Sequence, residues 1–192
     1  MDRAQLYAVL DDFLAALRAR DPLRVSWAPG ARHSENNVML QPGDGVWATI
    51  DSLGSYDLRF ADPVTGQVGW FGSVTEPQEE SACCLRIGVD PAGAIAEVEM
   101  VIVRDSEYGM ALPGKRFWTK PLLESNPAAP VSRAEMIALA DGYFSTLQLN
   151  DGTIRTKFTP DCNRVENGVQ TTNNPGYNTS PRDESDTIPS ND

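Results

Sequence analysis

LYAVLDDFLAALRARDP, residues 6–22, has the spacing of a helix that is apolar along one face. Its large apolar side chains recur at intervals of three and four positions, which places them on one side of a helix. They are Leu6, Leu10, Phe13, Leu14 and Leu17. Pro22 cannot continue the helix, because proline lacks the backbone N–H that the next turn needs. We expect an N-terminal helix that packs through this stripe and ends near Asp21.

Strand signals fill the segment that follows. Runs rich in β-branched and aromatic residues alternate with turn segments that contain Asp-Pro, Glu-Pro or Pro-Ala-Gly. A tight turn near residues 32–38 and a short helix near 46–53 precede these runs. The runs cover residues 56–60, 66–74, 83–89 and 94–103. The pattern predicts an α+β fold in which a meander of antiparallel strands packs on the N-terminal helix.

Residues 133–170 repeat the opening of the chain. A second turn at Glu166-Asn167 matches the first at Glu35-Asn36. Shifted by 130 positions, the second helix carries six residues identical to the first, namely Arg133, Ala134, Ala138, Asp141, Leu147 and Asp151 on Arg3, Ala4, Ala8, Asp11, Leu17 and Asp21. We interpret the chain as one complete helix-and-sheet unit followed by a partial copy of it.

Three segments follow from this interpretation: a complete unit at 1–125, a partial repeat at 130–170 and a polar tail at 171–192. Ser132 is the expected N-cap of the second helix, since a glutamate stands three positions later. The tail is too polar to offset the entropy of ordering it, so we expect it to be mobile. An incomplete copy leaves an apolar helix face and a sheet edge uncovered, and we therefore expect a homodimer.

Composition narrows the classes of partner. The chain has 16 Lys and Arg against 27 Asp and Glu, a formal net charge of -11, which argues against binding to a nucleic acid backbone. No apolar run is long enough to span a membrane, and none at the start reads as a targeting segment, so we expect a cytoplasmic protein. The three cysteines fit neither a disulfide framework nor a zinc site, and we expect them to be reduced.

From Ala4 to Val103, the leading amphipathic helix that ends in Asp-Pro, the hairpin and the sheet resemble the nuclear-transport-factor-2-like (NTF2-like) superfamily, in its SnoaL-like branch. The resemblance implies a curved sheet that forms a cone around a helix, with an apolar mouth for a small ligand. It also implies acid–base chemistry without a cofactor, as in ketosteroid isomerase, scytalone dehydratase and limonene epoxide hydrolase. This chain has one histidine where scytalone dehydratase uses two, and no catalytic residue of these enzymes falls on a matching position.

The residues themselves indicate one candidate site. His33 and Glu35 stand at positions i and i+2 of a predicted strand, so both side chains lie on one face. Such a pair suits proton transfer, with Glu35 as the general base and His33 as the acid that protonates a leaving group. Tyr7 or Asn36 would orient the substrate.

Two other interpretations of the same segment stay open. Asn36-Asn37 is also a hairpin turn signal, in which case Glu35 only flanks a turn. A metal site is weakened by the single histidine, because transition metals need clustered ligands, and we expect neither metal nor cofactor. Whether Arg164 and Glu166 form a second site is not decided by the sequence.

Aromatic residues are the candidate ligand-binding positions. They are Trp27, Trp47, Tyr56, Trp70 and Phe71, which would equally serve as the core of a small sheet protein. Two functions therefore compete. One is a cofactor-independent lyase or isomerase that acts on a small apolar or aromatic molecule. The other is a non-catalytic module that binds such a molecule in the same cavity.

Overall fold

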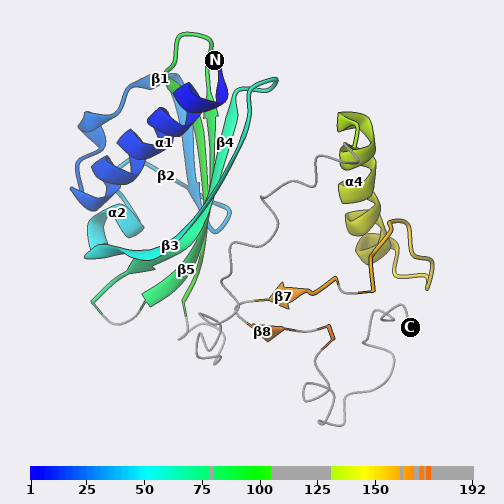
Figure 1. Cartoon of the computed structure of the whole chain (residues 1–192). Helices are drawn as coiled ribbons and strands as arrows, with labels where there is room; N and C mark the ends of the chain where they lie inside the picture. Colours follow the sequence, from blue (N-terminus) through cyan, green and yellow to red (C-terminus); the bar gives the residue numbers. More distant parts are fainter. Residues whose placement is uncertain (78–79, 105–130, 161, 167–168, 171, 174–192) are drawn as a thin grey trace. The chain divides into compact units, whose positions relative to one another are not determined.

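The computed structural model describes residues 1–77, 80–104, 131–160, 162–166, 169–170 and 172–173 (Figure 1). The chain divides into two compact units, Met1–Pro113 and Gly114–Asp192. The boundary expected near residues 125–130 and nearly all of the tail expected at 171–192 lie outside the described residues. Both expectations therefore stay predictions.

Helix α1 spans Arg3–Arg18, as the apolar stripe predicts. Asp2 caps its start: the Asp2 side chain accepts a hydrogen bond from the Gln5 backbone, and the Gln5 side chain accepts one from the Asp2 backbone. This reciprocal pair satisfies donors that the first turn leaves free. All five apolar side chains of the predicted stripe are buried in the core, so α1 is held mainly by its packing face.

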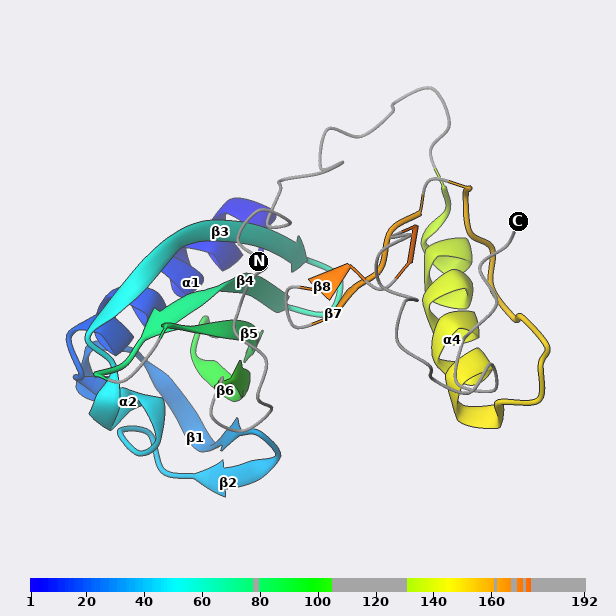
Figure 2. The same cartoon turned by 90° about the horizontal axis from the view of Figure 1, so that it is seen from below.

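A curved, open sheet of six strands forms the second layer of the first unit, with strand order β2-β1-β6-β5-β4-β3. A 3-10 helix η1 (Pro22–Arg24) precedes the first strand, and the short helix α2 (Val46–Thr49) lies between the second and third strands along the chain. Figures 1 and 2 show α1 and α2 on the same side of the sheet. The strands are β1 (Trp27–Glu35), β2 (Val38–Leu40), β3 (Ser52–Asp62), β4 (Gln67–Thr75), β5 (Glu80–Val89) and β6 (Ile95–Val103). The predicted α+β fold with a helix on a curved sheet is confirmed.

One pairing differs from the predicted antiparallel sheet. The strands β3 to β6 form an antiparallel meander, but β1 lies beside β6 and runs parallel to it. The N-terminal hairpin β1–β2 thus adds to the last strand of the meander, and the sheet is mixed. The side chain of Asn36 reinforces this junction, because its amide donates to the Ile102 carbonyl (3.0 Å) and accepts from the Ile102 N–H (2.8 Å).

The turn between β1 and β2 has the geometry that its two asparagines predict. Asn36 and Asn37 have φ values of 48° and 65°, both in the left-handed region that a two-residue hairpin turn of type I′ requires. Glu35 faces Val38 across the turn. The segment therefore forms the hairpin turn that Asn36-Asn37 predicts, and His33 and Glu35 on the strand before it are buried.

Cross-strand register separates an inner sheet face, toward α1 and α2, from an outer face. On the inner face Trp70 of β4 aligns with Leu85 of β5, which aligns with Met100 of β6 and then Glu35 of β1. These four side chains are buried. Residues next to them along each strand point to the outer face, since side chains alternate along a strand.

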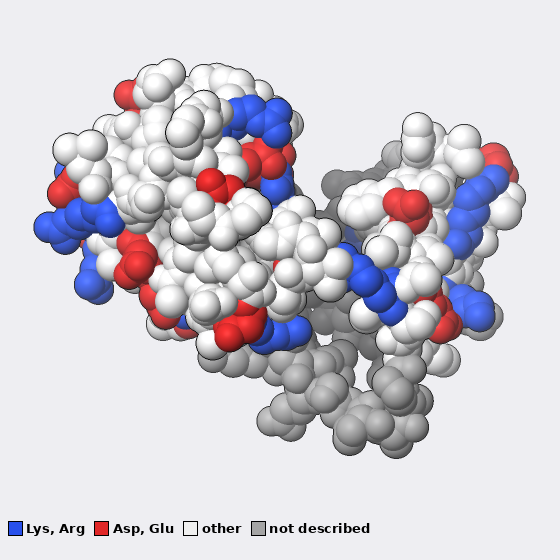
Figure 3. Space-filling model, turned by 90° about the horizontal axis from the view of Figure 1, so that it is seen from above, with Lys and Arg blue, Asp and Glu red and all other residues white. Residues whose placement is uncertain are grey.

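Charges of both signs are interspersed on the face of the first unit that Figure 3 shows. Several charged side chains of the first unit are paired, for example Arg20 with Asp51 at 2.7 Å and Arg59 with Asp11 at 2.6 Å. Among the described residues, no helix is long and apolar enough to cross a membrane. Cys83, Cys84 and Cys162 are free cysteines; Cys83 is buried and Cys162 is exposed.

The described part of the second unit contains α4 (Arg133–Leu149) and a hairpin of β7 (Val165–Glu166) and β8 (Val169–Gln170). Ser132 caps α4 by accepting from the Glu135 N–H at 3.2 Å, as predicted. Glu166 faces Val169, just as Glu35 faces Val38 in the first hairpin. This correspondence is what a repeat predicts, and the common origin of the two units stays a prediction.

Helix α4 differs from α1 in its packing. Gly142 is the buried residue of α4, and a side chain there would collide with the backbone carbonyl of Arg155. Thr156 also donates to the Leu139 carbonyl (2.8 Å). The large apolar side chains of the helix are largely exposed in the described structure, namely Met136, Ile137, Phe144, Leu147 and Leu149.

Candidate acid–base site

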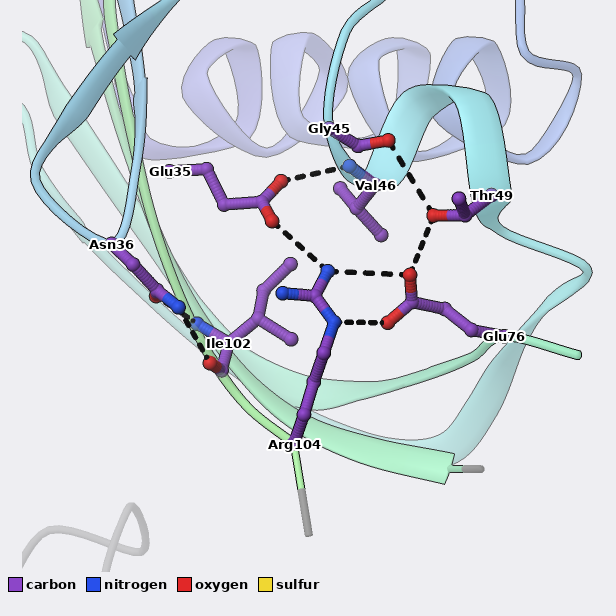
Figure 4. A network of polar contacts seen from close by, with 8 residues as sticks. All are labelled: Glu35, Asn36, Gly45, Val46, Thr49, Glu76, Ile102 and Arg104. Atoms are coloured by element: carbon purple, nitrogen blue, oxygen red, sulfur yellow. Dashed lines mark hydrogen bonds and ion pairs between the residues drawn. The ribbon is translucent and has the colours of Figure 1, made fainter. Parts of the chain in front are cut away.

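The inner face of the first unit holds a three-residue ion network (Figure 4). Arg104 donates from Nη2 to Glu35 Oε1 (2.9 Å) and from Nε to Glu76 Oε2 (2.7 Å). Glu76 also accepts from the Thr49 hydroxyl at 2.5 Å. Both glutamates are buried, and the arginine side chain is 21% exposed. The network places two carboxylates around one guanidinium.

Three separate elements bring these charges together. Glu35 is the last residue of β1, Glu76 follows β4, and Arg104 follows β6. The second oxygen of Glu35 accepts from the Val46 N–H (2.8 Å), at the start of α2. Gly45 makes this approach possible, because its φ is +64° and a Cβ there would overlap the Glu35 carboxylate.

Electrostatics inside the network favour the charged forms of Glu76 and Arg104. Burial by itself raises the pKa of Glu76, but hydrogen bonds from Arg104 and Thr49 outweigh it, so that the pKa lies below its ordinary value. The hydrogen bond to Glu76, together with the carboxylate of Glu35, raises the pKa of Arg104 although burial opposes this. A guanidinium between two carboxylates is thus fixed as a cation.

His33 lies two positions before Glu35 on β1 and is 1% exposed. Its Nδ1 lies 3.3 Å from the Gln41 carbonyl, while Nε2 has no hydrogen-bond partner among the described residues. Burial lowers the pKa of His33, and the Gln41 carbonyl, Glu35 and Asp44 oppose this without cancelling it. At neutral pH the ring is therefore neutral.

Cys83 and Ser81 belong to the same inner face, on β5. Cys83 is buried, and burial raises the pKa of its thiol, with a smaller contribution from Glu35. The thiol is therefore a poor nucleophile at neutral pH. The hydroxyl of Ser81 is buried without a hydrogen-bond partner among the described residues. Within the same ranges, no three His, Cys, Asp or Glu side chains are grouped to hold a metal ion.

The predicted aromatic residues divide between core, edge and outer face. Trp47 is buried edge-on to Phe13 (ring centroids 5.3 Å apart), and its indole N–H has no partner among the described residues. Trp27 is half-buried and donates to the Pro22 carbonyl at 2.9 Å. Tyr56 on β3 is half-buried, and burial raises its pKa.

Trp70 and Phe71 are neighbours on β4 and point to opposite faces. Trp70 is buried on the inner face, and its N–H donates to Asp57 at 3.0 Å. Phe71 is 43% exposed and contacts Phe60 on the outer face. Phe71 therefore does not line the interior with Trp70, because adjacent residues of a strand alternate between faces.

The two residues expected to orient a substrate are placed elsewhere. The Tyr7 hydroxyl lies 3.4 Å from the Arg59 carbonyl, and no described contact joins Tyr7 to His33 or Glu35. Both ends of the Asn36 amide are occupied by the backbone of Ile102. Their roles toward a substrate stay predictions that no described contact supports.

Sequence reasoning missed Arg104, Glu76 and Gln41. Glu76 stood in a Glu-Pro pair that was interpreted only as a turn, and Arg104 simply follows the last strand. Gln41 acts through its backbone carbonyl, which no side-chain pattern reports. Of the three, Arg104 alone carried a signal in the sequence, because it directly follows an apolar strand. A cation that such a strand carries into the interior needs a partner of opposite charge.

Comparisons with known proteins concern parts of the chain. A family model described as a domain of unknown function, DUF8021, matches residues 129–190. A search among curated proteins finds no match. Solved structures similar to the chain include NTF2-like and SnoaL-like proteins.

Three of these structures illustrate the extent of the likeness. A protein of the SnoaL-like family from Agrobacterium tumefaciens is 14% identical, with 53% of this chain and 99% of that chain covered and a TM-score of 0.38. A steroid delta-isomerase from Pseudomonas aeruginosa is 17% identical, with 54% of this chain and 83% of that chain covered and a TM-score of 0.42. An NTF2-like protein of unknown function from Cytophaga hutchinsonii is 7% identical, with 55% of this chain and 95% of that chain covered and a TM-score of 0.40.

Proposed function

We propose that the first unit is a cofactor-independent isomerase or lyase that acts on a small apolar or aromatic molecule by proton transfer. The observation that carries this proposal is the state of His33: a buried, neutral imidazole with one ring nitrogen bonded and the other unpartnered among the described residues. More than nine in ten buried polar groups in proteins have a partner, so a buried imidazole nitrogen without one is notable.

The Gln41 carbonyl fixes which ring nitrogen carries the proton. A carbonyl oxygen can only accept a hydrogen bond, so Nδ1 of His33 must be the donor at 3.3 Å. Neutral imidazole has a single N–H, and Nε2 therefore carries a lone pair. A neutral imidazole with a free lone pair is a general base near neutral pH.

Glu35 supports the base rather than acting as one. Each of its oxygens already accepts a hydrogen bond, one from Arg104 and one from Val46. Its charge raises the pKa of His33 against the effect of burial and so stabilises the imidazolium that forms when His33 accepts a proton. The proposal thus changes the roles expected from the sequence: His33 is the base rather than the acid, and Glu35 is its electrostatic partner rather than the base.

A non-catalytic binding module remains the second candidate, and one observation favours it. The carboxylates of Glu35 and Glu76 are both tied to Arg104, which leaves His33 alone to move protons. In a binding module the apolar core and Trp47 would carry affinity, and the network would be structural.

Proton exchange from carbon into deuterated water distinguishes the two candidates. Small aromatic and alicyclic ketones are first tested for binding by thermal shift, and those that bind are then followed by NMR. The enzyme proposal expects exchange at an activated carbon, and His33→Gln should lower its rate by roughly 10²–10⁴-fold while affinity changes little. Ser34→Ala, on the same strand but the other face, is the matched control. Binding without exchange would favour the module, and exchange by His33→Gln at the parent rate would refute His33 as the base.

A further inference from the structure

One nitrogen of the Arg104 guanidinium is shared between two carboxylates (Figure 4). Nη2 of Arg104 donates to Glu35 Oε1 at 2.9 Å and to Glu76 Oε1 at 3.2 Å. Nε of the same side chain donates to the other oxygen of Glu76 at 2.7 Å. The two contacts to Glu76 form a bidentate pair, which is the stronger arrangement of an arginine with a carboxylate. Glu76 therefore takes the larger share of the Arg104 charge, and Glu35 takes the smaller share.

The Thr49 hydroxyl limits the share that Glu76 takes. Thr49 is the last residue of α2 and donates to Glu76 Oε1 at 2.5 Å, the same oxygen that accepts from Arg104 Nη2. An oxygen with two donors binds each of them less strongly than an oxygen with one. Removing the hydroxyl would therefore strengthen the contact of Glu76 with Arg104 and weaken the contact of Arg104 with Glu35.

Two carboxylates act directly on His33. Burial lowers the pKa of His33, whereas the Gln41 carbonyl and the charges of Glu35 and Asp44 raise it. Glu35 stands on the same face of the same strand, two positions after His33. Because the Glu35 carboxylate is buried, water screens its charge little. A change in how far Arg104 compensates Glu35 should therefore be felt at the imidazole.

The other elements that surround the ring present uncharged groups. His33 aligns with Val98 of β6, and Val98 aligns with Ile87 of β5. Burial raises the pKa of the Cys83 thiol well above its usual range, so this β5 side chain is neutral at neutral pH. Helix α1 faces the sheet with its apolar stripe, and the Tyr7 hydroxyl contacts a carbonyl of β3. An effect of Glu76 on His33 must then pass through Arg104 and Glu35.

We propose that Glu76 is a positioning residue for His33: by sharing Arg104 with Glu35, it controls how much of the Glu35 charge remains to stabilise a protonated His33. The stronger the hold of Glu76 on Arg104, the less Glu35 is compensated and the stronger His33 is as a base. This inference rests on the proposed function, in which His33 is the base. The titration of His33, however, can be measured without a substrate.

NMR titration of the His33 ring in the full-length chain tests the proposal. His33 is the single histidine, so its ring signals need no further assignment. Glu76→Gln keeps the shape of the side chain and removes its charge, which leaves more of the Arg104 charge to compensate Glu35. The titration midpoint of His33 should shift to a lower pH than in the unmodified chain. An unshifted midpoint in folded Glu76→Gln overturns the proposal.

Glu99→Gln is the matched control, because it removes the same charge outside the network. Glu99 of β6 aligns with Ser34, the residue between His33 and Glu35, but it pairs with Arg86 and its side chain is 48% exposed. Water therefore screens its charge, and the His33 midpoint should stay where it is in the unmodified chain. A shift as large as that of Glu76→Gln would show a general effect of lost negative charge and would also overturn the proposal.

Thr49→Val changes the sharing in the opposite direction while every charge is retained. Without the hydroxyl, Glu76 should bind Arg104 more strongly, so that Glu35 is less compensated and the His33 midpoint shifts to a higher pH. An unshifted midpoint, or a shift to lower pH, contradicts the proposal. This variant also decides the matter if circular dichroism shows that Glu76→Gln does not fold.

Deuterium exchange from carbon separates this inference from the proposed function. If His33 is the base, Glu76→Gln should slow exchange at neutral pH by less than the roughly 10²–10⁴-fold expected of His33→Gln, because a weaker base remains. Shifted midpoints without any exchange would leave the coupling of Glu76 to His33 standing and would contradict the enzyme proposal. Exchange that depends on His33, together with unshifted midpoints, would support the enzyme proposal and overturn this inference.

Discussion

Glu35 and Arg104 are 69 positions apart in the sequence and form an ion pair of 2.9 Å on the inner face of the sheet. Arg104 also pairs with Glu76, so one guanidinium compensates two buried carboxylates. Breaking such a group by removing one member costs more than its net contribution, because the remaining charges stay buried without a partner.

Arg104→Met should therefore destabilise the first unit strongly. We expect a loss of about 3 kcal/mol in the free energy of unfolding, measured by urea denaturation. Arg24→Met is the matched control, since Arg24 pairs with Asp21 at the surface with 62% of its side chain exposed. The control should cost at most about 1 kcal/mol. Equal effects of the two substitutions would mean that the network around Arg104 is not a buried one.

Stability should depend on pH through His33, the single histidine of the chain. Its pKa in the folded protein lies below the ordinary value of 6.5, chiefly because of burial. As the pH falls below 6.5, His33 of the unfolded chain takes up a proton that the folded chain does not, so the free energy of unfolding decreases until the pH reaches the lower pKa of the folded protein. His33→Gln should remove this dependence of the free energy of unfolding on pH. Urea denaturation of both proteins between neutral and mildly acidic pH measures it, and parallel slopes would contradict the lowered pKa.

Gly45→Ala should disturb the network of Glu35, Glu76 and Arg104, although Gly45 is not a member of it. The φ of +64° is unfavourable for alanine, and the added Cβ would also overlap the Glu35 carboxylate. Gly93→Ala isolates the first effect, because Gly93 has a φ of +89° and open space around it. Thermal unfolding should show Gly45→Ala to be less stable than Gly93→Ala by about 1 kcal/mol or more. Equal losses would show that Glu35 can move aside at no cost.

Asn36 and Asn37 allow a comparison within one turn. Both have positive φ, but the Asn36 amide alone is bonded to the backbone of Ile102. Alanine at either position incurs the same kind of backbone strain. Asn36→Ala should therefore cost about 1–2 kcal/mol more than Asn37→Ala in urea denaturation, the contribution of the lost hydrogen bonds. No difference would mean that the β1–β6 junction does not depend on this side chain.

Several features of the fold were predictable because their cause is local. The apolar stripe of α1 lies within one helix, and the Asn36-Asn37 turn needs only two residues that tolerate positive φ. The shared face of His33 and Glu35 follows from strand alternation. The same alternation places Trp70 and Phe71 on opposite faces of the sheet, so the two residues do not line one cavity.

What only the tertiary structure decided is which distant residues meet. The sequence determined a helix, a hairpin and a set of strands, because spacing and turn chemistry act over a few residues. It did not determine that β1 runs parallel to β6, or that Arg104 reaches both Glu35 and Glu76. Those contacts depend on the order of strands in the sheet, which local preferences leave open. The role that we propose for His33 depends in turn on a backbone carbonyl at Gln41, whose position follows from the folded chain rather than from any side-chain pattern.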